Sequence, residues 1–237
     1  MVNKEIIQKS LDDAISKCSD GTSFSKPLRK AMNGFQEEYG GLTDHEELSI
    51  FDNQGNLIQH EKGTEHSVEV DDDDLIDNNM KNLNVTHNHP TLFADKVPTY
   101  LSEGDMESLF QTNREGDDLY RSVTAVSPND TSMTLIKTNK FSMKEADREK
   151  VWNAMMDLHD ACESYYDFYE ERVMDYMTMK AVEYQENHPG KFIRQSAFRE
   201  EASNHTLQSM GTLRGYLKKH GVMDALGAVN LKVKLQT

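Results

Sequence analysis

Apolar residues recur at two different spacings along the chain, one typical of helices and one typical of strands. Residues 4–18 are predicted to form a short amphipathic helix, because their apolar side chains recur at helical spacing: Ile6, Ile7, Leu11 and Ile15. A second helix is predicted over residues 27–39, where the pair Gly40-Gly41 ends it. Residues 1–42 therefore form a predicted N-terminal helical segment.

The middle of the chain carries the short, alternating apolar runs that favour strands. Apolar residues on both sides of the turn-forming residues 53–56 predict a β-hairpin, and residues 67–70 alternate like a further strand. Residues 84–90 are predicted as a strand that ends at a pair of histidines, His87 and His89. Residues 121–126 and 133–137 are predicted as a closing strand pair around an intervening turn.

Residues 71–74 are four consecutive aspartates between two of these segments. Neighbouring carboxylates suggest a calcium site, but the run lacks the spaced ligands and the central glycine of an EF-hand loop. We interpret it as a solvated turn or a helix start, followed by a short helix over residues 75–83.

The pattern changes at Ser142, where the sequence Ser-Met-Lys-Glu fits a capping box and predicts a helix start. Beyond it, apolar side chains recur at steps of three and four residues: Val151, Met155, Leu158, Cys162, Tyr165, Tyr169, Val173 and Tyr176. This near-heptad stripe predicts one helix that runs to about Asn187, where His188-Pro189-Gly190 ends it. Such a helix would be about 65 Å long. It must bend, pair with later helices near residues 192–220, or pair with a second copy of the chain.

Composition narrows the class of protein. The chain of 237 residues is long enough for one substantial domain with an elaboration, or for two small domains. It contains no apolar run of the roughly 20 residues that a membrane-spanning helix requires, and its charged start is unlike a secretory signal. Cys18 and Cys162 form no Cys-x-x-Cys pair, which excludes a cysteine-based zinc knuckle and argues against a disulfide framework. We therefore expect a soluble, cytoplasmic protein without a membrane partner.

The net charge of −15 disfavours binding to a nucleic-acid backbone, which requires clustered lysines and arginines. The charge is uneven, because residues 188–237 hold eight basic and three acidic residues, whereas residues 1–187 carry a net charge of −20. Such a basic tail either packs against the acidic remainder of its own chain or binds an acidic partner. Docking within the chain is the simpler interpretation.

The main chemical signal is the tetrapeptide HNHP at residues 87–90, followed after a spacer by Ser102 and Asp105. Side chains alternate along a strand, so His87 and His89 point to the same face and can reach one metal ion. Asp105, at the start of a predicted helix, can supply a third, anionic ligand. Three protein ligands leave one tetrahedral position for water, as in catalytic zinc sites.

The pattern H-x-H-P, a spacer and S-x-x-D resembles the JAMM signature of the JAB/MPN family. HNHP after a hairpin and a Gly-Thr turn also resembles the RadC branch and phage-borne members. The resemblance implies an α+β fold, in which residues 43–141 form a mixed β-sheet flanked by helices. Residues 142–237 would add a helical C-terminal region that contains the long helix. The resemblance also implies Zn²⁺ held by His87, His89 and Asp105.

Two catalytic roles follow from the resemblance. Ser102 would help to hold the oxyanion, and a glutamate on an early strand would accept a proton from the attacking water. Glu46 and Glu47 are both candidates for this glutamate, and strand parity places them on opposite faces. We select Glu46, because it shares a face with Leu48 and Ile50, an apolar setting in which a carboxylate becomes a useful base.

The resemblance predicts a zinc-dependent hydrolase of peptide or isopeptide bonds, of phage or mobile-element type, with a protein or peptide substrate. Two other functions stay open. One is a non-catalytic JAB-like scaffold that binds a partner, or a second copy, through the helix at residues 143–187. The other is a RadC-like protein that works near DNA.

Other potential ligands are interpreted as ordinary surface or packing residues. Acidic residues and one histidine on the long helix could imitate a metal site, but no second motif completes it, so we expect a solvated helix face: Asp157, His159, Asp160 and Glu163. His60 and His66 are expected at the surface. The tyrosines of the long helix are expected to pack against other helices: Tyr165, Tyr166, Tyr169 and Tyr176.

Overall fold

The computed structural model describes residues 23–42, 44–65, 67–90, 99–127, 131–141 and 144–236. Within these ranges the strands are β1 (Glu47–Phe51), β2 (Leu57–Lys62), β3 (Leu83–Asn88), β4 (Tyr120–Ser127), β5 (Thr131–Lys137) and β6 (Leu231–Gln236). The α-helices are α2 (Lys26–Tyr39), α3 (Asp73–Asp77), α4 (Glu103–Glu107), α5 (Arg148–Asn187), α6 (Arg199–Met210), α7 (Leu213–Lys219) and α8 (Val222–Ala228).

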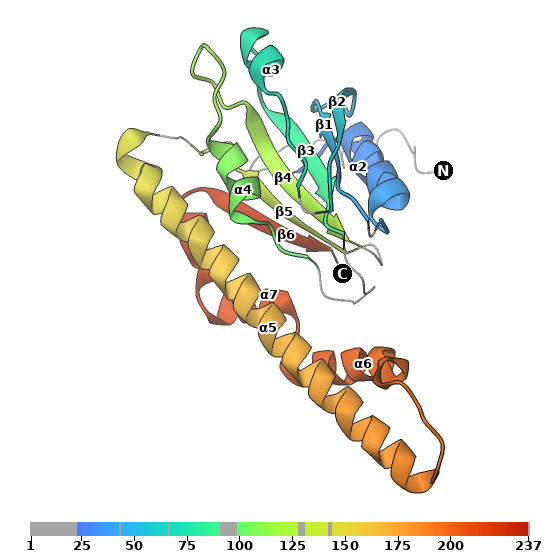
Figure 1. The fold of residues 1–237 in the computed structure, drawn as a ribbon. Coiled ribbons are helices and arrows are strands. Elements are labelled where there is room, and N and C mark those ends of the chain that lie inside the picture. Colours follow the sequence, from blue (N-terminus) through green and yellow to red (C-terminus); the bar gives the residue numbers. More distant parts are fainter. Residues whose placement is uncertain are drawn as a thin grey trace, which may run out of the picture.

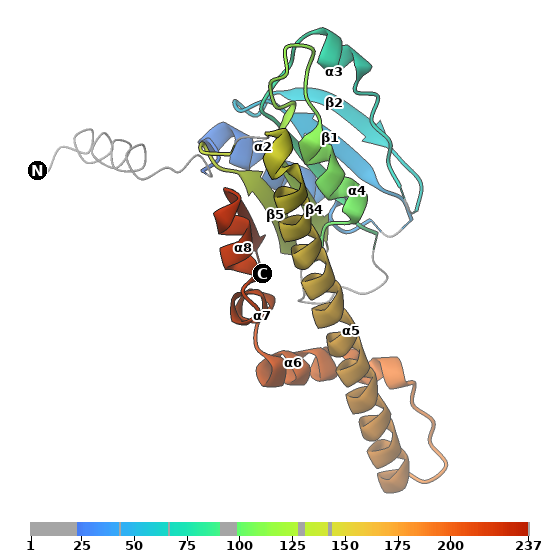
Figure 2. The same ribbon diagram turned by 90° about the vertical axis from the view of Figure 1, so that its left-hand side faces the viewer.

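The strands form one mixed sheet in the order β2-β1-β3-β4-β5-β6 (Figure 1). Neighbouring strands are antiparallel, except that β3 and β4 are parallel. Helix α2 packs on one face of the sheet against Phe51 and Val126, and α5 crosses the other face (Figure 2). This mixed sheet with flanking helices confirms the expected α+β class.

The early elements agree with the sequence pattern wherever the structure describes them. Helix α2 begins after Ser25, whose hydroxyl accepts a hydrogen bond from the N–H of Leu28, and it ends at Gly40. Strands β1 and β2 form the predicted hairpin. The helix predicted over residues 4–18 lies outside the described residues.

Residues 67–70 do not form a strand, so that prediction is wrong. The N–H of Thr64 donates to the carbonyl of Ser67 at 2.8 Å, and this turn leads the chain away from β2, the edge of the sheet. Val68 and Val70 pack against the hydrophobic core without a neighbouring strand. Apolar and polar residues alternate over residues 67–70 because one side of this loop is buried, and not because the segment pairs with a strand.

The acidic run at residues 71–74 is the start of a helix, as interpreted. Helix α3 begins at Asp73 and ends at Asp77, so the helix predicted over residues 75–83 is too long. Asn79 and Asn82 adopt positive φ angles of 53° and 56°, a conformation incompatible with continuing the helix.

The long helix is confirmed, with a later start. A 3₁₀ turn over Glu145–Asp147 precedes α5, which begins at Arg148 and ends at Asn187, with His188 as its C-cap. Ser142, the predicted cap, lies outside the described residues. Tyr176 is half-buried, and the buried positions of that turn and the next are Met177 and Ala181. An α-helix has 3.6 residues per turn, whereas a heptad pattern repeats every 3.5 residues. Apolar positions at heptad spacing therefore move gradually off the buried face, and spacings of four residues bring them back to it.

Helix α5 is supported by the helices that follow it in the chain (Figures 1 and 2). The hydroxyl of Tyr165 donates to the carbonyl of Gly211 at 2.8 Å, and that of Tyr169 donates to the Ser203 hydroxyl at 2.6 Å. The tyrosines are therefore packing residues, as expected. Of the three arrangements open for this helix, the structure contains the pairing with later helices, and self-association stays a prediction.

Strand β6 is an element that the sequence pattern did not indicate. Residues 231–236 were expected to belong to a helical region, but they pair antiparallel with β5 and complete the sheet. Leu231 and Val233 are buried in the same core as α5, while Lys232 between them is exposed. The chain end thus returns to the sheet, and the predicted central and C-terminal parts share one hydrophobic core.

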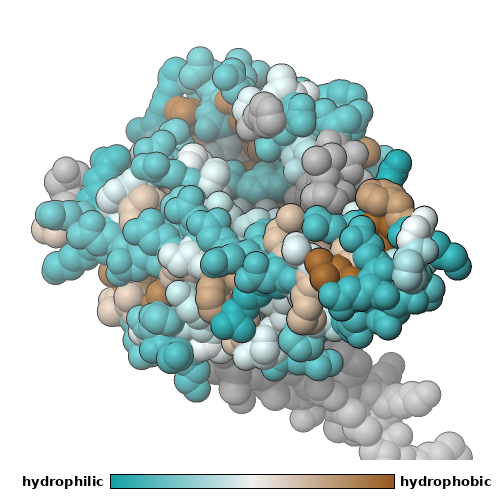
Figure 3. Space-filling view, turned by 60° about the horizontal axis from the view of Figure 1, so that its bottom comes forward, coloured by the Kyte–Doolittle hydropathy of each residue, from teal (hydrophilic) through white to brown (hydrophobic). Residues whose placement is uncertain are grey.

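Hydrophilic side chains cover most of the face shown in Figure 3, and apolar residues appear there in small groups. Some large apolar side chains of α5 are nonetheless exposed: Phe168, Met174, Met179 and Val182. No helix in the described part of the chain is long and apolar enough to cross a membrane.

Candidate metal centre

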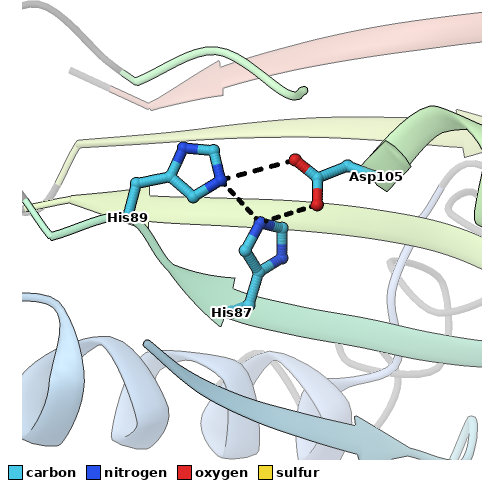
Figure 4. Close-up of side chains that lie close together, drawn as sticks. All are labelled: His87, His89 and Asp105. Atoms are coloured by element: carbon cyan, nitrogen blue, oxygen red, sulfur yellow. Dashed lines mark hydrogen bonds and ion pairs between the residues drawn. The ribbon is translucent and has the colours of Figure 1, made fainter. Parts of the chain in front are cut away.

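The structure brings His87, His89 and Asp105 together at one end of the sheet (Figure 4). The Nε2 atoms of His87 and His89 lie 3.1 and 3.4 Å from the two carboxylate oxygens of Asp105. The same two nitrogens lie 2.9 Å from each other. The residues come from the end of β3 and the first turn of α4, as the sequence predicts.

These three ligand atoms fit a single ion. All lie within 4.8 Å of one another. A tetrahedral ion with ligand bonds of about 2.0–2.1 Å holds its ligand atoms about 3.3 Å apart, close to the observed spacings. Two imidazole lone pairs that face each other at 2.9 Å repel unless a proton or a cation lies between them. The triad could therefore bind a metal ion.

The second nitrogen of His89 has its own partner. Its Nδ1 lies 2.9 Å from the hydroxyl of Thr99, and its main-chain N–H donates to the carbonyl of Val126 at 3.1 Å. A hydrogen bond at Nδ1 holds the ring in one orientation and directs Nε2 towards the metal position. Thr99 lies in the spacer after the HNHP segment, and sequence reasoning missed this contact.

Ser102 and Asp105 form a reciprocal capping box at the start of α4. The Ser102 hydroxyl accepts a hydrogen bond from the N–H of Asp105 at 3.1 Å, and Oδ2 of Asp105 accepts one from the N–H of Ser102 at 2.7 Å. The S-x-x-D pattern thus has a structural cause that the sequence already carried. The capping box fixes the carboxylate so that Oδ1 faces His87.

Charges within the triad reinforce one another. Burial alone would raise the pKa of Asp105, but the charges and hydrogen bonds of His87 and His89 hold that pKa well below its usual value. Burial alone would lower the pKa of His87, but the carboxylates of Asp105 and Glu46 raise it. Asp105 is therefore an ionised carboxylate beside two imidazoles, which is a suitable ligand set for a cation.

The two candidate glutamates lie on opposite faces of the sheet. Leu48 is the cross-strand neighbour of His87, so Glu46, two residues before it, shares the face of the triad and lines the same cleft. Glu47 is buried on the other face, where its oxygens lie 2.8 and 3.0 Å from Nε2 of His45 and of His60. Glu46, and not Glu47, therefore shares the cleft with the candidate ligands.

The triad opens into a cleft of about 790 Å³. Apolar side chains of the segment after β2 form one wall, and Tyr100 forms another. Four acidic side chains outside the triad also line it: Glu46, Glu65, Asp72 and Glu107. Among the described lining residues there is no lysine or arginine. A cleft of this size accommodates several residues of an extended peptide.

His159 corrects one sequence interpretation. It was expected on a solvated face of the long helix, but it is half-buried and lines the cleft. Its Nδ1 lies 3.1 Å from the carbonyl of Leu101, and its ring packs against Tyr100 at 5.4 Å between centroids. The neighbouring acidic residues Asp157 and Asp160 are exposed, as predicted. No pattern in the sequence could reveal that the helix meets the cleft at this one position.

The fold and the site together define an α+β protein with a candidate His₂-Asp metal centre in an acidic cleft. No protein-family model matches the chain, and neither a curated protein nor a solved structure matches it. The resemblance to the JAB/MPN family therefore stays a prediction that rests on the residues of the site.

Proposed function

We propose that this chain is a zinc-dependent hydrolase of peptide or isopeptide bonds, of the JAMM type. The observation that carries the proposal is the convergence of His87, His89 and Asp105 within 4.8 Å, in a cleft that Glu46 also lines. Two histidines and one carboxylate form a ligand set typical of catalytic zinc. When bound there, Zn²⁺ would polarise the scissile carbonyl and make water more acidic.

Glu46 is the general base in this proposal. It lies directly before β1, half-buried, on the same face as the triad. Its carboxylate would accept a proton from the attacking water and pass it to the departing amine. Leu48, two residues along the strand, lines the cleft beside it and excludes water from that side.

Ser102 would stabilise the oxyanion. Its oxygen accepts a hydrogen bond from Asp105, which leaves the hydroxyl hydrogen free to be donated towards the cleft. Removal of one oxyanion donor from a serine protease costs about 100- to 1,000-fold in kcat, and we expect a loss of similar size here. Because Ser102 also caps α4, its loss would lower both the turnover and the order of Asp105.

The substrate is a protein or peptide, bound as an extended chain along the cleft. The buried thiol of Cys162, which forms no disulfide in the described chain, fits a reducing compartment such as the cytoplasm. The exposed apolar side chains of α5 would serve to bind a partner or a second copy, with Phe168 and Met179 on one side of the helix.

Elemental analysis of the purified protein tests the metal centre. We expect about one zinc per chain in the wild type and almost none in the double variant His87→Ala, His89→Ala. His188→Ala is the matched control, because His188 is exposed at the end of α5, outside the cleft. Absence of zinc from the wild type after incubation with it at neutral pH would refute the centre.

Hydrolysis of fluorogenic peptide and isopeptide substrates tests the chemistry. Glu46→Gln should abolish turnover while zinc content stays at the wild-type level, because the amide keeps the shape and removes the base. Glu65→Gln, which changes another acid of the same cleft, should retain turnover. Full zinc content with no hydrolysis by the wild type, across both substrate types, would leave a metal-binding scaffold instead of an enzyme.

A further inference from the structure

A second cavity, of about 600 Å³, lies on the opposite side of the sheet from the metal centre. On strand β4, Val123 lines the cleft of the metal centre, whereas Thr124 and Val126 line this second cavity. Successive side chains of a strand point to opposite faces, so the two hollows are separated by the sheet itself. The walls are α2, strands β4 to β6 and the start of α7.

Basic side chains from three separate elements line this cavity. They are Arg29 of α2, Arg214 of α7 and Lys234 of β6. None of its described lining residues is acidic, although the whole chain carries a net charge of −15. Arg29 and Arg214 form no ion pair with any described residue. Three basic side chains therefore meet at this cavity without an acidic side chain among its described lining residues.

Lys234 lies close enough to Arg29 to be repelled by its positive charge. The pKa of Lys234 is lowered first by its burial and then by the positive charges of Arg121, Lys232 and Arg29. The ammonium of Lys234 also lies 4.7 Å from the centre of the Phe24 ring, so part of its charge faces an aromatic surface.

Hydroxyl groups line the sheet side of the cavity. Thr124 and Thr134 are hydrogen-bonded to each other at 2.9 Å on its floor. Ser132 lies beside them on β5, and its hydroxyl forms no hydrogen bond with a described residue. Guanidinium forks, an ammonium and a hydroxyl donor are the groups that recognise phosphate oxygens in proteins.

We propose that this cavity binds a small molecule that carries phosphate groups. Arg29 and Arg214 would grip phosphate oxygens through their paired N–H groups, Lys234 would act as a point charge, and Ser132 would donate a hydrogen bond. A volume of about 600 Å³ is that of a small-ligand site, whereas a nucleic-acid backbone needs cations spread over an extended surface. Arg214 and Lys234 belong to the basic tail, so the tail holds this anion between itself and α2.

Isothermal titration calorimetry on the full chain tests the proposal, with inorganic phosphate, AMP and ATP as separate probes. We expect saturable binding of at least one probe that weakens as salt concentration rises. Arg214→Gln and Lys234→Gln should each weaken it by about tenfold, since each removes one charge-assisted hydrogen bond. Arg172→Gln is the matched control, because Arg172 is exposed on α5 and outside the cavity. Thermal melts of all variants establish that they are folded.

The three probes identify the source of the phosphate. Binding of inorganic phosphate alone, sensitive to the cavity variants, assigns the site to the free ion, and tighter binding of AMP or ATP assigns it to a nucleotide. The proposal fails if no probe binds, or if Arg214→Gln and Lys234→Gln leave binding unchanged. It also fails if Arg172→Gln weakens binding equally, or if His87→Ala, His89→Ala abolishes it, because the anion would then bind elsewhere.

Discussion

The side-chain oxygen of Asn88 accepts a hydrogen bond from the main-chain N–H of Glu47 at 2.6 Å. The amide nitrogen of Asn88 donates to the carbonyl of His45 at 3.1 Å. Asn88 is fully buried and lies between the two candidate histidine ligands, on the opposite face of the strand. It therefore connects the end of β3, which carries the candidate ligands, to the segment that carries Glu46.

Asn88→Leu removes both hydrogen bonds and keeps the branched shape of the side chain. We expect zinc affinity to fall by about tenfold, because groups that orient the ligands contribute at least that much to metal binding. Competition with a chelator of known affinity measures the change. Asn153→Leu, at an exposed position of α5, is the control. Equal zinc affinity in the wild type and Asn88→Leu would mean that the strand end is held without this residue.

Asp72 offers a test of pH dependence. Its carboxylate accepts a hydrogen bond from the Tyr120 hydroxyl, and burial raises its pKa, with further contributions from Asp71 and Asp73. A raised pKa means that the folded state favours the protonated acid, so this contribution to stability is present below the ordinary pKa and is lost as pH rises through the raised value. At neutral pH the ionised carboxylate is therefore destabilising.

Asp72→Asn removes that charge and keeps an oxygen acceptor for Tyr120. We expect the Tm of Asp72→Asn to exceed that of the wild type at neutral pH, and the difference to shrink as the pH falls below the raised pKa. Melting curves across the acidic range measure this. A variant that is less stable than the wild type at neutral pH would show that the hydrogen bond needs the charged acceptor.

Substitution of Tyr169 tests whether the packing of α6 against the long helix α5 stabilises the fold. Tyr169 is fully buried, and its hydroxyl donates to Ser203 of α6 at 2.6 Å. Tyr169→Ala should lower the free energy of unfolding by about 3–5 kcal/mol, as for other large aromatic residues in cores. Phe168→Ala changes the preceding residue, which is 43% exposed, and should cost far less. Chemical denaturation compares the two, and similar losses would contradict the observed packing of α6.

Substitution of Leu231 tests how much the last strand, β6, contributes to stability. The side chain of Leu231 is 1% exposed, and the residue pairs with Lys137 at the edge of β5. Leu231→Ala should cost about 2–5 kcal/mol of stability. Lys232→Ala, on the opposite face of the same strand, should change stability by no more than about 0.5 kcal/mol. An undiminished Tm in Leu231→Ala would mean that β6 adds little to the core.

Local signals account for the elements that were predicted correctly. The hairpin follows from turn residues between apolar runs, and α5 follows from a stripe repeated over many turns, so that a single misplaced position such as Tyr176 changes little. The predictions for residues 67–70 and for residues 231–236 were wrong for opposite reasons. The first segment alternates without a partner strand, whereas β6 has its partner, β5, about 100 residues earlier in the chain.

The sequence by itself determined the candidate ligands His87, His89 and Asp105, because H-x-H on a strand and S-x-x-D at a helix start fix local geometry within a few residues. It also determined which glutamate shares their face, since parity is a local property. Only the tertiary structure decided that Thr99 and His159 meet this site. Only the tertiary structure, likewise, gathered Arg29, Arg214 and Lys234 around one cavity. Such contacts join distant segments, and packing of the whole core sets them.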